Sequence, residues 1–325
     1  MVSLEAVKLS NSALKDYGPG LVGVFVGGLS GIGEATARSF VKYAISPRVY
    51  LVGRNEAEAS KAIEELEKVN ADSRVSFVKC DVSLLRRVDE ACRNIQEKEK
   101  KVNLLVLSPG AVATKERDET SERLDKRLAL HYYARMRFIS NLLPQLISAA
   151  TQPNAPVAGK GRGLASVVSV LEAGGEGPLI LEDLPLKKNY SLKNCAKHAI
   201  TMTSLSMEEL AKANPAVSFI HSHPGTVMTG VFRDFGPLVQ ALMNVLFFLA
   251  KPWMVPLEDS GERHLFAASG VPKTQALGEG SGKPYLVSWD GEPRGNQNVL
   301  NLYREKKIGE VVWNHTQDIF RRICG

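Results

Sequence analysis

The sequence lacks any apolar run long enough to cross a bilayer. Its longest apolar stretch, residues 239–250, is interrupted by Gln240 and Asn244, and a membrane helix needs about 18 or more consecutive apolar residues. The first 20 residues contain no apolar segment of the kind found in secretory signals. These absences predict a cytoplasmic protein without a membrane span.

Cysteine is also scarce, with 4 residues in 325. The four are Cys80, Cys92, Cys195 and Cys324. No two of them form a C-x-x-C pair, so the sequence predicts neither a disulfide framework nor a zinc ribbon, and it suits a reducing compartment. A zinc site needs more ligands than His221 and His223, which share one face of a predicted strand, and no metal is expected.

A strong excess of charge of one sign is missing as well. Lys and Arg number 41 against 35 Asp and Glu, and the densest basic stretches, residues 98–101 and 117–137, also contain acids. A nucleic-acid interface usually concentrates Lys and Arg on one face, so no nucleic-acid partner is predicted. The hydrophobic content of 44% predicts a large core, which we interpret as one α/β domain.

A glycine-rich turn follows the first clear strand pattern. Residues 24–26 are β-branched and aromatic, glycines follow as Gly27-x-x-x-Gly31-x-Gly33, and apolar residues then recur at helical spacing. Glycine lets the backbone approach a pyrophosphate closely, and the unpaired N–H groups of a helix N-terminus attract its charge. The turn, which includes Ser30 and Ile32, is predicted to bind a dinucleotide. The simpler alternative is an ordinary turn between strand and helix.

The second strand pattern, residues 48–53, ends in Arg54 and Asn55. In a nucleotide-binding βαβ unit, the residue about 20 positions after the last glycine meets the adenosine ribose. A carboxylate there favours a free 2′-hydroxyl, whereas an arginine favours a 2′-phosphate. Arg54 therefore predicts NADP rather than NAD. The alternative is that Arg54 only ends the strand in solvent.

Strand and helix patterns alternate along the chain. Strand patterns at 48–53, 74–80, 102–107, 164–170 and 285–289 are interspersed with helix patterns at 56–69, 84–97, 124–143 and 311–324. Such alternation predicts an α/β fold with a doubly wound parallel sheet, the Rossmann fold. We expect a single domain over residues 1–325, with a cofactor-binding core at 21–230. Residues 231–325 are expected to supply a substrate lid, the last strand and a C-terminal extension.

These motifs resemble those of the short-chain dehydrogenase/reductase family over residues 21–268. The glycine turn matches the family's T-G-x-x-x-G-I-G, although Val26 replaces the threonine. The resemblance implies an adenine contact from Asp81 and Val82, and contacts near the nicotinamide from two later segments. These are Ser108 and Gly110, where the family has N-A-G, and Pro224, Gly225, Val227 and Thr229, within a P-G-x-V-x-T pattern. Residues 251–253 and 261–264 resemble long, retinol-dehydrogenase-like members of fungal natural-product pathways.

The resemblance also implies a catalytic tetrad, from which this sequence departs. In the family a Ser and a Tyr hold the substrate oxygen, a Lys four residues after the Tyr lowers its pKa, and an Asn positions a relay water. Tyr190 aligns with the tyrosine, but Asn194 stands four residues later and Lys193 only three. Helix positions three and four residues along lie about 100° apart around the axis, so Lys193 either approaches the ribose by another path or is solvated.

The other two tetrad positions are also altered. The family asparagine falls at His131, which is either a hydrogen-bonded core residue or a proton relay. The family serine falls at Leu171 or Glu172. If Glu172 is partly desolvated it is a candidate acid, and if ionised it is a candidate partner for a cationic substrate. The alternative is a carboxylate in water at the rim.

Residues 232–254 are rich in apolar and aromatic side chains. Such a composition is typical of a pocket for a bulky, largely apolar ligand, although plain core packing or an interface helix would look the same.

We therefore predict an NADPH-dependent reductase acting on a C=O or C=N group of a bulky, largely apolar metabolite. The resemblance suggests secondary-metabolite biosynthesis. Since the Ser and Lys positions are altered, non-redox chemistry on the same fold is the alternative, and a non-catalytic NADP(H)-binding regulator is a third hypothesis. Relatives often pair through the helices that carry His131 and Tyr190, so pairing into a homodimer is one expectation.

Replacing Arg54 tests the cofactor assignment. The Arg54→Ala variant should bind NADPH about tenfold or more weakly, because it loses a charge-assisted hydrogen bond to the 2′-phosphate. Binding of NADH, which has no such phosphate, should stay unchanged. Fluorescence titration with both nucleotides measures this, and equal losses for the two would remove the NADP assignment.

Overall fold

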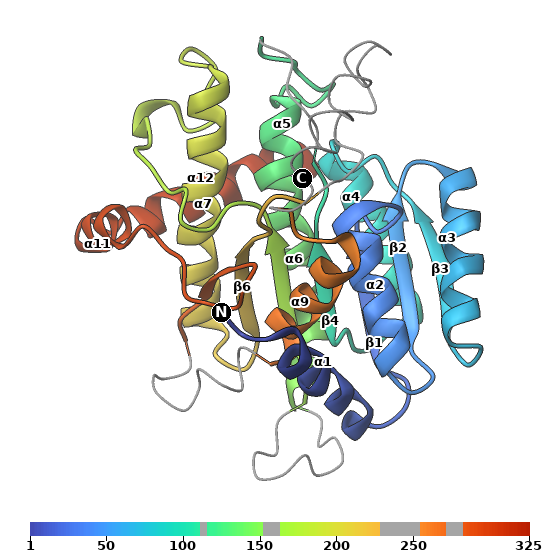
Figure 1. The fold of residues 1–325 in the computed structure, drawn as a ribbon. Helices are drawn as coiled ribbons and strands as arrows, with labels where there is room; N and C mark the ends of the chain where they lie inside the picture. Colours follow the sequence, from blue (N-terminus) through green and yellow to red (C-terminus); the bar gives the residue numbers. More distant parts are fainter. Residues whose placement is uncertain (111–115, 152–162, 228–253, 271–281) are drawn as a thin grey trace, which may run out of the picture.

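A parallel sheet of seven strands forms the centre of the protein, with the order β3-β2-β1-β4-β5-β6-β7. The structure, a computed structural model, describes residues 1–110, 116–151, 163–227, 254–270 and 282–325 (Figure 1). The strands are β1 (Val22–Val26), β2 (Arg48–Gly53), β3 (Arg74–Lys79), β4 (Leu104–Leu107), β5 (Ser166–Val170), β6 (Ser218–His223) and β7 (Tyr285–Ser288). The order reverses between β1 and β4, so the predicted doubly wound sheet is confirmed.

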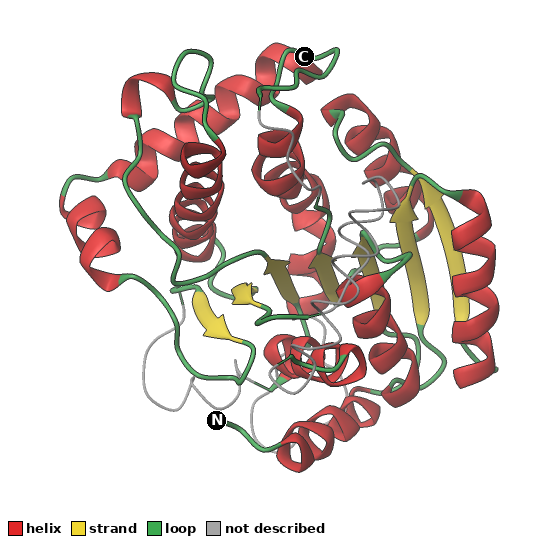
Figure 2. Ribbon diagram, turned by 45° about the horizontal axis from the view of Figure 1, so that its top comes forward, coloured by secondary structure: helices red, strands yellow, loops and turns green. Residues whose placement is uncertain are grey.

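The central strands are buried on both faces, as a parallel sheet between helix layers requires. All five residues of β1 and all five of β5 are buried, whereas the edge strand β3 is mostly partly exposed. Val24 of β1 pairs with Tyr50 of β2 on one side and with Leu105 of β4 on the other. Figure 2 shows the arrows lying side by side with helices on either side of them.

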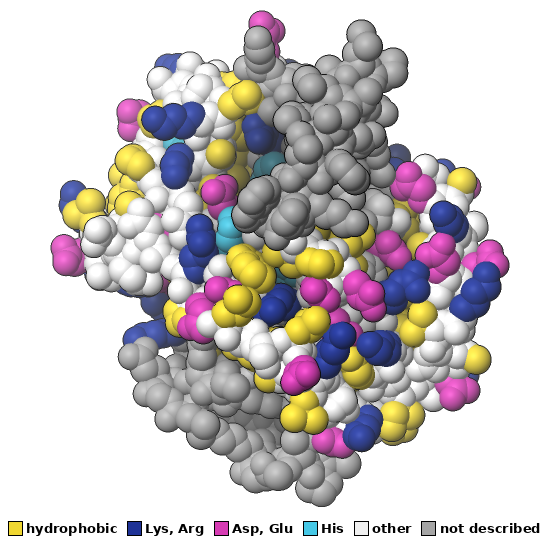
Figure 3. All heavy atoms as spheres, in the orientation of Figure 1, with side chains coloured by type: hydrophobic (Ala, Val, Ile, Leu, Met, Phe, Trp, Pro, Cys, Tyr) yellow, Lys and Arg dark blue, Asp and Glu magenta, His cyan; other side chains and the backbone are white. Residues whose placement is uncertain are grey.

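Two helix layers cover the sheet. One face carries α2 (Gly31–Tyr43), α3 (Glu56–Val69) and α9 (Leu257–Ser269), with α1 (Leu4–Ser12) against α9. The other carries α4 (Leu85–Lys98), α6 (Ala134–Thr151) and α7 (Leu192–Ala213), with α11 (Gln297–Glu305) and α12 (Ile308–Cys324) outside them. Among the described residues no helix has the length and apolar character needed to span a membrane. Figure 3 shows acidic and basic side chains interspersed on the visible face, without a basic stripe.

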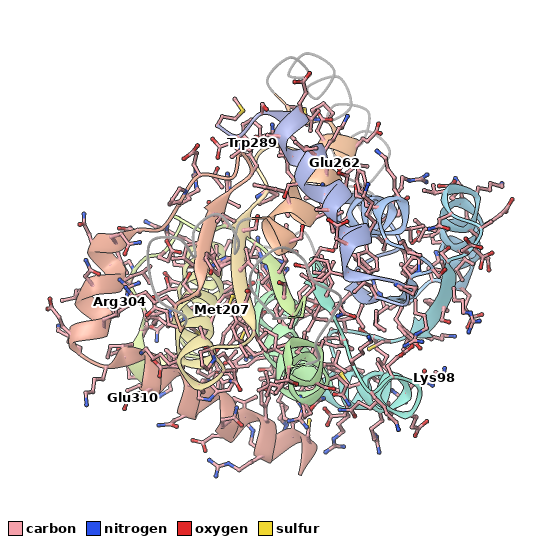
Figure 4. All side chains as sticks on the ribbon, turned by 90° about the horizontal axis from the view of Figure 1, so that it is seen from below. Lys98, Met207, Glu262, Trp289, Arg304 and Glu310 are labelled. Carbon is pink, nitrogen blue, oxygen red and sulfur yellow. The ribbon has the colours of Figure 1, made fainter. Side chains whose placement is uncertain are left out.

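A buried glutamate ties the N-terminal helix α1 to the layer formed by α2 and α9. Glu262 of α9 is 1% exposed and accepts hydrogen bonds from Asn11 (2.8 Å), Lys42 (3.0 Å) and the Tyr43 hydroxyl (3.0 Å). Figure 4 labels Glu262, which belongs to α9. A buried carboxylate is tolerated only when such partners replace its water. The sequence analysis did not anticipate α1, because a nine-residue helix of mostly exposed side chains gives little periodic signal.

The helix predicted at 124–143 is interrupted. Asp125 caps a short helix, α5 (Lys126–Leu128), by accepting the N–H groups of Arg127 and Leu128. A π turn, η2 (Ala129–Tyr133), follows and leads into α6. A π turn carries one extra residue and is a frequent feature of functional sites. Here it contains His131.

The C-terminal helix α12 packs on α7, on α4 and on the π turn. Tyr132 is fully buried, and its hydroxyl lies 2.7 Å from Ser206 Oγ of α7 and 2.5 Å from Thr316 Oγ1 of α12. Because Thr316 already donates its proton to the Val312 carbonyl, Tyr132 donates to Thr316 and accepts from Ser206. The sides of the π turn and of α7 that α12 covers are therefore buried within a single chain.

Removing the Tyr132 hydroxyl should loosen α12. The Tyr132→Phe variant leaves the buried Ser206 hydroxyl without its acceptor, and we expect a loss of about 1–3 kcal/mol in the free energy of unfolding. Denaturant unfolding followed by circular dichroism measures it. Val311→Ala on the exposed side of the same helix is the matched control and should stay within about 0.5 kcal/mol of wild type. An unchanged midpoint for Tyr132→Phe would show that this contact does not hold α12 in place.

Candidate cofactor and active site

The glycine turn between β1 and α2 has no room for side chains. Gly27 and Gly31 have φ angles of +79° and +63°, which favour glycine. A Cβ at Gly33 would lie 2.3 Å from Ser108 Oγ and 2.5 Å from the Gly27 carbonyl oxygen. The backbone segments that contain Gly27, Gly33 and Ser108 therefore lie close together in this turn. The hypothesis that the turn binds a pyrophosphate requires such close packing.

The N-terminus of α2 is open. Ser30 at its N-cap is exposed and makes no side-chain capping bond, whereas α3 is capped by Asn55 and α7 by Ser191. The N–H groups of Gly31 and Ile32 start the helix at the carboxyl end of β1. An uncapped helix start, with its positive dipole end, fits a phosphate group.

Arg54 and Asn55 lie at the carboxyl end of β2, next to this turn in the sheet order. Both are exposed. The Asn55 side chain accepts the N–H groups of Ala57 (3.0 Å) and Glu58 (3.3 Å), so it shapes the start of α3. Arg54 thus extends from a fixed turn and fits the 2′-phosphate role.

The ends of β3 and β4 lie at the same edge. Asp81 accepts hydrogen bonds from the Ser83 N–H (3.1 Å) and hydroxyl (2.7 Å), which closes a turn beside the buried Val82. Ser108, directly after β4, donates to the Val26 carbonyl at 3.2 Å. The serine that replaces the family asparagine therefore ties β4 to β1.

His131 in the π turn borders the end of β4. Its Nε2 would lie 3.4 Å from a Cβ placed at Gly110. Burial, together with the charges of Arg135 and Arg127, lowers the pKa of His131 to about 3. The imidazole is therefore neutral at physiological pH, where it can donate one hydrogen bond and accept another.

Arg135, one helical turn after His131, is a residue that the sequence analysis missed. It is 1% exposed and donates to the carbonyl oxygens of Leu107 (3.1 Å), Pro109 (2.6 Å) and Val170 (2.8 Å). It also donates to Ser169 Oγ at 2.8 Å. No motif marks it, because its partners are mostly backbone carbonyls contributed by two strands.

Glu172 follows β5 and is exposed. Its backbone N–H donates to Nε2 of His221 at 3.3 Å, which orients the turn that begins here. The side chain of Glu172 is thus exposed, and the turn is held through its backbone.

A buried chain of hydrogen bonds continues from His221. Because Nε2 accepts from Glu172, the ring proton is on Nδ1 and is donated to Ser204 Oγ of α7 at 2.8 Å. Ser204 in turn donates to Glu176 at 2.8 Å, and Glu176 accepts the Asn296 N–H at 2.9 Å. Burial and the nearby Arg135 charge lower the pKa of His221 to about 3. This histidine is structural, and the described part of the chain contains no cluster of side chains suited to a metal ion.

Tyr190 lies just before the N-cap of α7 and is half-buried. Burial and the neighbouring Asp125 carboxylate raise the pKa of Tyr190 to about 12. Lys193 is exposed, and the Asn194 side-chain amide donates to the Asn189 carbonyl at 2.8 Å. Neither residue therefore stands beside the Tyr190 hydroxyl in the way a tetrad lysine would.

Two other cations hold the turn after β5. Lys197 of α7 donates to the Gly175 carbonyl at 2.7 Å, and Arg294, after β7, donates to the Ala173 carbonyl at 3.0 Å. Sequence reasoning missed both, because their role depends on which carbonyls the fold brings near them. They clamp the backbone that carries Glu172.

The segment after β6 passes under an aromatic ring. Gly225 has a φ of +71°, and a Cβ there would meet Trp289 at 2.8 Å. Pro224 precedes it, and Val227 pairs with Val255. Thr229 and residues 232–253, the expected lid, lie outside the described residues.

Comparison with known proteins identifies the class that this fold and site define. The profile described as short chain dehydrogenase matches residues 22–157. The oxidoreductase AN1596 of Emericella nidulans is 43% identical over 98% of this chain and 98% of its own length. The oxidoreductase andH of Emericella variicolor is 35% identical, covering 100% of this chain and 98% of its own. The protein belongs to the short-chain dehydrogenase/reductase family and is an oxidoreductase.

Solved structures show the same fold at low sequence identity. L-sorbose reductase from Gluconobacter frateurii, complexed with NADPH and L-sorbose, aligns with a TM-score of 0.57 at 19% identity, over 84% of this chain and 97% of its own. The RhlG/NADP complex of Pseudomonas aeruginosa aligns with a TM-score of 0.60 at 17% identity, over 85% and 97%.

A methyl group at Gly33 should close the glycine turn. In Gly33→Ala the new Cβ must displace Ser108 Oγ or the Gly27 carbonyl, so we expect NADPH binding to weaken by about tenfold or more, equivalent to about 1.4 kcal/mol. Gly309→Ala in α12 is the control, since its Cβ meets only the movable end of Glu209. Calorimetric titration compares the two. NADPH affinity at the wild-type level in Gly33→Ala would argue against this turn as the pyrophosphate site.

Proposed function

We propose that the protein is an NADPH-dependent reductase of a bulky, largely apolar metabolite in secondary metabolism. The observation that carries this proposal is the uncapped N-terminus of α2 behind a glycine turn with no room for side chains, with the exposed Arg54 one strand away. The similarity to fungal oxidoreductases supports it.

The chain's own residues divide the task of holding the cofactor. The pyrophosphate is assigned to the α2 N-terminus, the 2′-phosphate to Arg54, the adenine to Asp81 and the nicotinamide end to the loops after β4 and β6. The full assigned set is Gly27, Ser30, Gly31, Ile32, Gly33, Arg54, Asn55, Asp81, Val82, Ser108, Gly110, Tyr190, Pro224, Gly225, Val227 and Thr229. When bound, NADPH supplies the hydride.

Tyr190 is our proposed proton donor, with Glu172 and His131 as the other candidates. With its pKa raised to about 12, the Tyr190 hydroxyl keeps its proton at neutral pH. Without a neighbouring lysine it is a weak acid, so proton transfer to the product oxygen is slower than in a complete tetrad.

The exposure of Lys193 and the local hydrogen bond of Asn194 favour a second candidate function. A site without its tetrad lysine suits a cyclisation, isomerisation or elimination, in which the fold orients a substrate without net redox change. This alternative predicts product formation at unchanged mass.

We also propose a cytoplasmic location. A homodimer of this chain has to use a surface other than the sides of the π turn and of α7 that α12 covers.

Incubation of the purified protein with NADPH and an extract of the native pathway tests the function. We expect falling reduced-nicotinamide absorbance and a product two hydrogens heavier than its substrate. Tyr190→Phe should lower turnover about a hundredfold, within the usual range for a general acid, with a much smaller effect on NADPH binding. A product of unchanged mass formed at constant absorbance would establish the non-redox alternative, and undiminished turnover in Tyr190→Phe would move the donor assignment to Glu172.

A further inference from the structure

Arg135 is a buried cation without a carboxylate partner in the described part of the chain. It is 1% exposed, and its five hydrogen-bond acceptors are neutral oxygens: four backbone carbonyls and the Ser169 hydroxyl. Two other buried charges do have ion-pair partners. Glu262 has Lys42 as its ion-pair partner, and Glu208 of α7 has Arg304.

Burying a charge is costly unless an opposite charge or many hydrogen bonds replace its water. Burial lowers the pKa of Arg135 only to about 9, so the guanidinium remains positive at neutral pH. Carbonyl dipoles satisfy its N–H groups but do not neutralise its charge. The folded chain therefore carries one net positive charge at this point.

The position of this charge is the second observation. Leu107 and Val170 end β4 and β5, and the Pro109 carbonyl lies between Ser108 and Gly110. In open parallel sheets, ligands bind outside the carboxyl ends of the strands. The guanidinium thus lies directly beneath the edge of the sheet where a substrate would react.

We propose that Arg135 is the countercharge for an oxyanion in the active site, so that the hydride acceptor is a carbonyl group and not a cationic iminium. This inference rests on the proposed reductase function and selects between the two acceptor classes that the sequence left open. Arg135 is a positioning residue here, acting through its field and through the carbonyls it holds.

The charge balance of the two reactions explains the choice. Hydride addition to a carbonyl carbon forms a C–H bond and moves the C=O π pair onto oxygen, while the nicotinamide is oxidised. The resulting alkoxide is negative until it takes a proton, and a buried cation nearby lowers its energy. An iminium carries its positive charge into the site and loses it on reduction, so the same cation opposes its binding.

The neighbouring groups agree with this assignment. His131 lies one turn from Arg135 and is kept neutral, so it adds no second charge. Glu172, the carboxylate that an iminium would need beside it, is exposed at the rim.

Fluorine NMR with two small ions of opposite charge tests the proposal on the full chain. Trifluoroacetate and trimethyl(trifluoroethyl)ammonium, whose positive charge does not depend on pH, are titrated into the protein saturated with NADPH, which fills the phosphate sites. We expect trifluoroacetate to bind at least tenfold more tightly, Arg135→Met to abolish the preference and Arg135→Lys to retain it. The proposal would be overturned if the two ions bound equally, if neither bound, or if the ammonium ion were preferred. It would also be overturned if Arg135→Met kept the wild-type preference.

The same titration without nucleotide separates this inference from the cofactor proposal. If NADPH does not bind, the proposed function fails, whereas the difference in trifluoroacetate affinity between wild type and Arg135→Met still reports on Arg135. Should Arg135→Met not fold, the Arg135 Nε–H resonance of the wild type provides the answer. It should shift with trifluoroacetate and not with trimethyl(trifluoroethyl)ammonium, and an unmoved resonance would refute the oxyanion role.

Discussion

The close packing of β1, α2 and β4 at the reversal of strand order is the constraint on which the rest of the structure depends. Gly33 of α2 has its Cα against the Gly27 carbonyl and the Ser108 hydroxyl, and Ser108 in turn donates to the carbonyl that ends β1. The strands are parallel, so the turns after β1, β2, β3 and β4 all lie at one edge of the sheet, beside this contact. The open end of α2 points to the same edge, so the features that suit a dinucleotide follow from a single packing requirement.

The substrate side of that edge is organised differently. Its backbone carbonyls are held by cations from three separate elements: Arg135 from α6, Lys197 from α7 and Arg294 from the segment after β7. These contacts fix the ends of β4 and β5, and among the three cations only Arg135 is fully buried. One part of the edge thus has the glycine turn and the open end of α2, and the other part has a buried arginine.

The fold was largely predictable because its signals are local. Apolar runs mark the central strands, and the glycine spacing marks the first turn, so the doubly wound parallel sheet could be inferred. The short helices α1 and α11 were missed because each buries only two residues. The π turn was also missed, since one extra residue in a helix leaves the apolar pattern around His131 almost unchanged.

The sequence by itself determined the α/β class, the glycine turn and the polar ends of the strands, because each depends on residues close together in the chain. Only the tertiary structure decided the surroundings of the reactive groups: that Glu172 lies in water, that Lys193 is exposed, and that Arg135 is buried among carbonyls from β4 and β5. Burial and charge at a point depend on segments tens of residues apart, and no spacing along the chain encodes which of them meet. His131 is neutral for the same reason, since both its burial and the Arg135 charge lower its pKa.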